Sequence, residues 1–155
     1  MRYEVTLVRT GMCVQLGWAT PSFPRTLDVA LTRTRTLLGV GDDEHSWGAD
    51  GLRRQAWHKP RGVEALPLPN SFPVTWADGD TVGVGADLQA GTISYSLNGG
   101  AYHVAFTGCD FGTRSIFPAV SLKDGVCEVN FGFGEVGGFG YYVGKEVGAR
   151  VGGVV

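Results

Sequence analysis

Residues 39–51 read GVGDDEHSWGADG, and this stretch decides the fold class. Its glycines and acidic residues disfavour a helix. It nevertheless contains Trp47, a large aromatic residue of the kind that a globular protein normally buries. We therefore expect a turn followed by a strand that carries Trp47 into a core. The acidic residues of the turn are expected to cap backbone amides.

The sequence on both sides of this stretch has the two-residue period of β-strands. Apolar residues alternate with polar or small ones in Tyr3–Leu7, Met12–Trp18, Ile93–Leu97 and Cys127–Phe131. Such alternation is typical of strands with one buried face. The segment nearest to a helical stripe, Leu27–Leu38, is interrupted by threonines and arginines.

Turn signals separate these segments at short intervals. Asn98-Gly99 favours a type I′ turn, which would pair residues 92–97 with 101–106. Asp124-Gly125 predicts a second hairpin that joins residues 116–122 to 126–131. Short strands with frequent turns predict an all-β sandwich or barrel.

Composition limits the chain to one globular domain without a charge-driven partner. The chain has 155 residues, 43% of them hydrophobic and 18% charged, which suits a single domain with its own core. A formal net charge of -2 gives no reason to expect nucleic acid or an anionic membrane as partner. No apolar run approaches the roughly 18 residues that a membrane span needs. The first residues lack the features of a secretory signal.

The three cysteines, Cys13, Cys109 and Cys127, are widely spaced. No Cys-x-x-Cys pair is present, so neither a zinc finger nor a thioredoxin-type site is predicted. Cys13 and Cys127 lie in strand-like segments, where thiols usually pack as small apolar groups. We therefore expect a reducing compartment, the cytoplasm or the nucleus.

Neither a metal site nor an active site is predicted. The acidic turn fails the calcium-loop pattern because Arg53 occupies the position of the closing carboxylate. The histidines lack a zinc-ligand spacing, and no nucleophile elbow or phosphate loop is present. We expect no cofactor and no enzymatic activity, and a non-standard carboxylate site for a metal stays open as an alternative.

The four tryptophans admit two readings. Packing in the core is the first, because each indole can bury about 150–250 Å². A lectin-like sugar platform is the second, and it would require solvent-facing rings. The residues concerned are Trp18, Trp47, Trp57 and Trp76.

Several blocks in register resemble the SPRY family. Besides residues 39–51 they are Val14–Thr20, Gly79–Gly83, Tyr95–Gly99 and Phe117–Leu122. The resemblance runs from about residue 2 to residue 132. It implies a two-sheet antiparallel β-sandwich that binds other proteins through its loops and catalyses nothing.

The two ends of the chain give further expectations. Members of the family have more strands upstream, so we expect a fragment or a truncated gene model that lacks the most N-terminal strands. We expect the sandwich to span residues 1–143, because residues 144–155 are rich in glycine and resemble a flexible tail or linker.

The resemblance also implies where a protein or peptide partner binds. Two loops at one end of the sandwich would form the contact, with three further residues near the rim. The first loop contains Arg35 and Thr36, the second contains Lys123, Asp124 and Gly125, and the rim contains Asp50, Arg53 and Arg54. The peptide-binding branch of the family commonly has an aromatic residue where this chain has Thr36 and Asp124, so that ligand is not expected here.

The sequence of residues 39–47 is similar to the corresponding sequence of SPRY domains within large multidomain proteins, including ubiquitin ligases and ryanodine receptors. This implies an adaptor role, such as substrate recognition, inside a longer chain. The basic run Arg53, Arg54, Lys59 and Arg61 has two readings that stay open. It is either a solvated edge or a site for an acidic or phosphorylated peptide.

Overall fold

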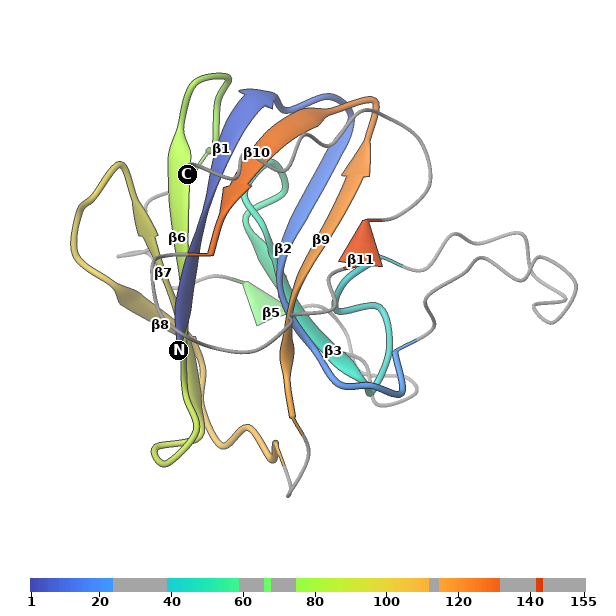
Figure 1. Cartoon of the computed structure of the whole chain (residues 1–155), viewed down its shortest axis with the longest axis vertical. Coiled ribbons are helices and arrows are strands. Elements are labelled where there is room, and N and C mark those ends of the chain that lie inside the picture. The colour runs from blue at the N-terminus through green and yellow to red at the C-terminus, as the bar shows by residue number, and fades with distance from the viewer. Residues whose placement is uncertain (24–38, 59–65, 68–74, 112–114, 132–141, 144–155) are drawn as a thin grey trace, which may run out of the picture.

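Two β-sheets pack face to face in the computed structural model, which describes residues 1–23, 39–58, 66–67, 75–111, 115–131 and 142–143 (Figure 1). The five-stranded sheet has the order β10 (Val126–Asn130), β1 (Arg2–Arg9), β6 (Thr81–Asp87), β7 (Thr92–Leu97) and β8 (His103–Phe106). The six-stranded sheet has the order β11 (Tyr142–Val143), β9 (Phe117–Lys123), β2 (Cys13–Ala19), β3 (Ser46–Asp50), β4 (Gln55–Trp57) and β5 (Leu66–Pro67).

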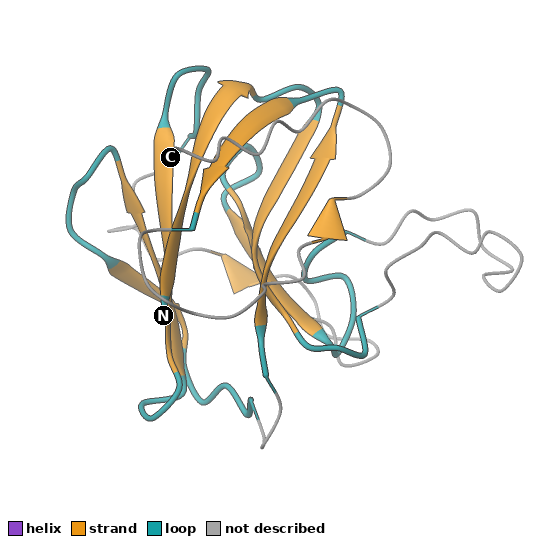
Figure 2. Ribbon diagram, viewed as in Figure 1, coloured by secondary structure: helices purple, strands orange, loops and turns teal. Residues whose placement is uncertain are grey.

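These sheets confirm the predicted all-β sandwich. Neighbouring strands are antiparallel, apart from the short parallel pairing of β11 with β9. The described residues consist of strands and loops (Figure 2). Among them, no helix has the length and apolarity that a membrane crossing requires.

The alternating residues of both sheets form the core between them. Tyr3, Val5 and Leu7 of β1 are at most 2% exposed, and Val14 and Leu16 of β2 are fully buried. This burial follows from the two-residue period, which directs every second side chain to the same face.

Two buried tyrosines connect the sheets by hydrogen bonds. The Tyr3 hydroxyl, on β1, donates to the Gly17 carbonyl of β2 at 2.6 Å and lies 3.2 Å from the Ala119 carbonyl of β9. The Tyr95 hydroxyl, on β7, donates to the Leu16 carbonyl of β2 at 3.0 Å. A buried hydroxyl without a partner would be costly, so these bonds help to fix how the sheets face each other.

Residues 39–45 cover the outer face of the six-stranded sheet. The Val40 amide donates to Ser121 Oγ of β9 at 2.9 Å, and Gly39 lies directly against the Gln15 side chain of β2. As a result Gln15 is only 3% exposed, so β2 is buried on both faces rather than on the one face that its alternation predicts. A second small apolar cluster forms under this segment from Ala19, Phe23, Val40 and Ala119.

The acidic turn and the tryptophans have the structural roles that the sequence predicts. Asp42 Oδ2 accepts a hydrogen bond from the Gly39 amide at 2.7 Å, and Asp43 Oδ1 accepts one from the His45 amide at 3.0 Å. Trp18, Trp47 and Trp76 are at most 4% exposed, and Trp57 is partly buried.

The two predicted hairpins have different outcomes. Asn98 and Gly99 have φ values of 50° and 73°, and β7 pairs with β8, so the type I′ turn is confirmed. The prediction of a hairpin at Asp124-Gly125 is wrong, because β9 pairs with β2 whereas β10 pairs with β1 in the other sheet. This turn is a corner that carries the chain from one sheet to the other.

Candidate functional site

Two such corners meet at one end of the sandwich. One leads from β1 to β2 through Gly11, and the other leads from β9 to β10 through Asp124 and Gly125. The Met12 amide donates to the Lys123 carbonyl at 2.8 Å. A Cβ on Gly11 would lie 2.5 Å from the Gly125 nitrogen, so the two backbones are in direct contact and only glycine fits. The corners lie side by side at the top of Figure 1.

The turn after β3 joins this end through the pairing of β2. Within the six-stranded sheet Cys13 pairs with Lys123 on one side, and Gln15 pairs with Asp50 on the other. Arg53 Nη2 lies 3.8 Å from Cys13 Sγ. Three chain segments that are distant in sequence therefore meet around Cys13. We name their exposed residues the corner surface: Met12, Arg53, Arg54, Lys123 and Asp124.

Asp50 shapes this surface from below. Its side chain is fully buried, and its Oδ1 accepts hydrogen bonds from the Leu52 and Arg53 amides, both at 2.9 Å. Its Oδ2 accepts a bond from Arg53 Nε at 2.6 Å. The carboxylate predicted near the rim thus fixes the turn and orients Arg53.

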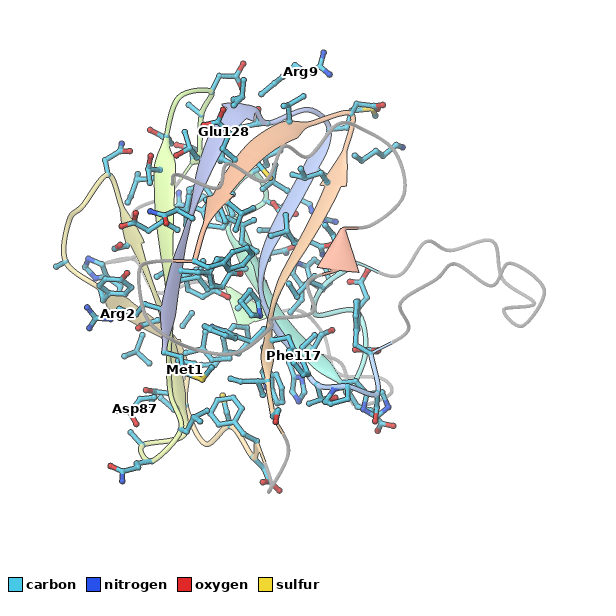
Figure 3. The ribbon with its side chains drawn as sticks, in the orientation of Figure 1. Met1, Arg2, Arg9, Asp87, Phe117 and Glu128 are labelled. Carbon is cyan, nitrogen blue, oxygen red and sulfur yellow. The ribbon has the colours of Figure 1, made fainter. Side chains whose placement is uncertain are left out.

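Gly125 is also buried, in contrast to its neighbours Lys123 and Asp124. A Cβ at this position would lie 3.0 Å from the carbonyl oxygens of Arg9 and Thr10. Gly125, which the sequence predicted as a contact residue, is therefore a close-packed backbone position within the corner. Arg9 marks this end of the sandwich in Figure 3, far from Arg2 at the other end of β1.

The guanidinium of Arg53 is charged and held in place. Partial burial works against its charge, but the hydrogen bond and the charge of Asp50 outweigh it and raise the pKa of Arg53 above its ordinary value. Burial, followed by the nearby charge of Asp50, raises the pKa of the Cys13 thiol. Cys13 is therefore a neutral thiol at neutral pH, and its sulfur accepts the contact from Arg53.

The backbone is strained at two of these loops. Arg54 and Asp124 both have a φ of 57°, in the left-handed region that residues other than glycine seldom adopt. Asp tolerates this region better than Arg does. Asn98, in the hairpin between β7 and β8, has a similar φ of 50°, so these values mark tight turns at the corner surface.

Four residues of the predicted binding region lie outside the described residues: Arg35, Thr36, Lys59 and Arg61. The described residues contain one member of the corner surface that the sequence did not single out, Met12, whose side chain is 68% exposed. Its position in the alternation with Val14 and Leu16 grouped it with the buried face. The signal for exposure was the turn glycine immediately before it.

The chemistry of the corner surface suits non-covalent recognition. It combines an exposed thioether with the charged ends of Arg53, Arg54, Lys123 and Asp124. In the part of the chain that the structure describes, no group of three or more His, Cys, Asp or Glu side chains is arranged to hold a metal ion.

Comparison with known proteins matches the SPRY domain over residues 1–134. The chain is 38% identical to the E3 ubiquitin-protein ligase RKP of Arabidopsis thaliana over 136 residues, which are 84% of this chain and 9% of that protein. It is 31% identical to SPRY domain-containing SOCS box protein 2 of Mus musculus and of Rattus norvegicus over 91 residues, which are 58% of this chain and 34% of each relative. The chain thus spans well under two thirds of the length of these relatives.

Proposed function

The chain belongs to the SPRY domain family, and on that premise we propose that it is a non-catalytic module that docks a partner protein or peptide on the corner surface. SPRY domains are typically protein-interaction modules. The observation that carries the proposal is the convergence of three exposed loop segments on one end of a rigid sandwich. Loops held by a rigid scaffold are where binding residues usually lie.

The composition of the surface supports docking. Met12, at 68% exposure, offers an apolar side chain that a partner can bury. The exposed charged side chains of Arg53, Arg54 and Lys123 belong to the same surface and offer partners for charges on a bound protein. The burial of Trp18, Trp47 and Trp76 weighs against the lectin-like alternative, because a sugar platform needs accessible rings.

The relatives suggest a wider setting. One of them is named as an E3 ubiquitin-protein ligase, so we propose that the module recognises substrates or partners for such an assembly, within a longer chain. We place the domain at residues 1–143 and a linker at 144–155. The three cysteines are free thiols, which favours the cytoplasm or the nucleus as its location.

A double variant of the second corner tests the proposal. Lys123→Ala with Asp124→Asn removes both charges, and asparagine accepts the positive φ at position 124. Stability should stay within about 0.5 kcal/mol. Affinity for a partner captured by pull-down should fall at least about fivefold in titration calorimetry, since a central contact contributes more than about 1 kcal/mol.

The matched control carries the same change of charge elsewhere. Arg2→Ala with Glu4→Gln alters exposed residues of β1 on the five-stranded sheet, and it should leave partner affinity unchanged. Equal affinity of the corner variant and the native protein would place the binding site elsewhere.

A further inference from the structure

Arg53 is held in one orientation by contacts on three sides. Its Nε donates to Asp50 Oδ2 at 2.6 Å, its Nη2 lies 3.8 Å from Cys13 Sγ, and its Cζ lies 5.1 Å from the centre of the Trp57 ring. The side chain is nevertheless 52% exposed. The charged end is therefore fixed and accessible at the same time.

A fixed guanidinium is a prepared receptor for a planar anion. Ordering a free arginine side chain on binding costs rotamer entropy, and here the fold has already ordered it. Within the described part of the chain, the polar contacts of the guanidinium engage the Nε hydrogen and one hydrogen of Nη2, which leaves both hydrogens of Nη1 and the second hydrogen of Nη2 to reach a ligand. The planar arrangement of these donors matches a carboxylate.

The surroundings favour a negatively charged ligand. Lys123 lies across Cys13 from Arg53, and Arg54 follows directly in the chain. The charge of Asp50 is buried beneath Arg53 and bonded to it. The charge of Asp42 also acts on Arg53 and Cys13, and this carboxylate accepts a hydrogen bond from the Gly39 amide. Among the five residues of the corner surface, Arg53, Arg54 and Lys123 are cations and Asp124 is the acid.

We propose that the corner surface recognises an acidic segment of its partner protein, with Arg53 as the residue that binds a carboxylate and Lys123 as its supporting cation. This inference rests on the proposed docking function and names the chemistry of the ligand. Arg53 sets specificity by geometry as well as by charge. Lysine cannot replace it, because a lysine ammonium lacks the planar fork.

Nuclear magnetic resonance on the 15N-labelled protein tests the inference with a defined probe. Blocked triglutamate is titrated in, and blocked triglutamine serves as the neutral control peptide. Triglutamate should cause a saturable shift of the Arg53 Nε–H signal and of the Lys123 amide, and triglutamine should not. An equal response to the two peptides, or no response at Arg53, would overturn the inference.

Conservative variants separate fork geometry from charge. Arg53→Lys keeps the charge and should weaken triglutamate binding at least about threefold. The matched control Arg2→Lys, over the Tyr102 ring beside the five-stranded sheet, should bind as the native protein does. If Arg53→Lys binds triglutamate with native affinity while its melting temperature is unchanged, Arg53 is not the carboxylate receptor.

Asp50→Asn distinguishes a prepared receptor at Arg53 from a diffuse positive field, because the two explanations predict opposite changes in triglutamate affinity. It removes a negative charge, so a diffuse positive field predicts tighter triglutamate binding. It also releases Arg53 from its strongest contact, so a prepared receptor predicts weaker binding. If the buried change prevents folding, Arg53→Lys alone decides.

Two further outcomes have fixed meanings. If inorganic phosphate shifts the Arg53 signal and triglutamate does not, the carboxylate assignment is wrong. If the Lys123/Asp124 variant loses its partner while Arg53→Lys retains full partner affinity, docking at the corner surface stands and the acidic-segment inference fails.

Discussion

Trp47 packs between two other rings in the interior. Its indole stacks on His58 with ring centres 4.6 Å apart, and Phe111 meets it edge-on at 5.3 Å. His58 Nδ1 lies 2.8 Å from the Ser46 carbonyl, a contact that places the imidazole over the indole. Trp47, the large aromatic residue of the acidic stretch, is therefore a centre of packing.

Truncation of this ring should be severe. Trp47→Ala removes the stacked pair and leaves a cavity, which should lower the free energy of unfolding by about 3–5 kcal/mol. Leu88→Ala, at a side chain that is 51% exposed, should change it by less than about 0.5 kcal/mol. Chemical denaturation of the two variants measures both values. A Trp47→Ala protein as stable as Leu88→Ala would contradict the assigned role.

Two thiols, that of the buried Cys127 and that of the partly buried Cys109, make the stability of the fold depend on pH in the alkaline range. Burial raises the pKa of Cys127 from 9.0 to about 11, and burial raises that of Cys109 from 9.0 to about 11. Between these pKa values the unfolded chain releases protons that the folded chain retains. The contribution of the two thiols to the free energy of unfolding is therefore fully present below pH 9 and decreases as the pH rises toward 11.

The measurement is denaturation at several pH values from 7 to about 10.5. The native protein should lose stability above pH 9, and Cys127→Ala should show a shallower loss because it lacks one of these groups. Identical slopes for the two proteins would mean that Cys127 titrates normally in the fold.

At the scale of elements, turn chemistry predicts where the chain reverses but not which strands pair. Asn98-Gly99 and Asp124-Gly125 have similar turn residues, yet the first joins neighbouring strands and the second changes sheets. The partner of β10 is β1, at the opposite end of the sequence. Such pairing depends on long-range packing, which local residue patterns do not encode.

The contact between the two corners should be sensitive to a single methyl group. Gly11→Ala places a Cβ directly against the Lys123 carbonyl oxygen and also strains a φ of 65°. Gly99→Ala is the matched control, because its φ is 73° and a Cβ there meets nothing within 4 Å.

Gly99→Ala should therefore cost about 1–2 kcal/mol from φ alone. Gly11→Ala should cost at least about 1 kcal/mol more, since the clash with backbone adds to the same strain. Thermal melts of the two variants compare these costs. Similar losses of stability in the two variants would show that the two corners can move apart to accommodate the added Cβ.

At the scale of the whole molecule, the binding end combines predicted and unpredicted parts. The family resemblance implied the loop with Lys123 and Asp124, and the structure leaves both exposed. Asp50 is buried and Met12 is exposed, contrary to the sequence reading. Both follow from the pairing of β2 with β3 and β9, which sets accessibility only once the chain has folded.

Metal removal is the last test, and it addresses the whole domain. The acidic turn is the strongest candidate for a metal site in the sequence, but Asp42 and Asp43 already accept backbone hydrogen bonds. Carboxylates committed to backbone amides are poorly placed to surround an ion with six or more oxygens. Treatment with EDTA should therefore leave the melting temperature within about 1 °C of the untreated protein. A drop of many degrees that calcium or zinc reverses would mean that these carboxylates hold an ion instead of capping the turn, and that the stability of the sandwich depends on it.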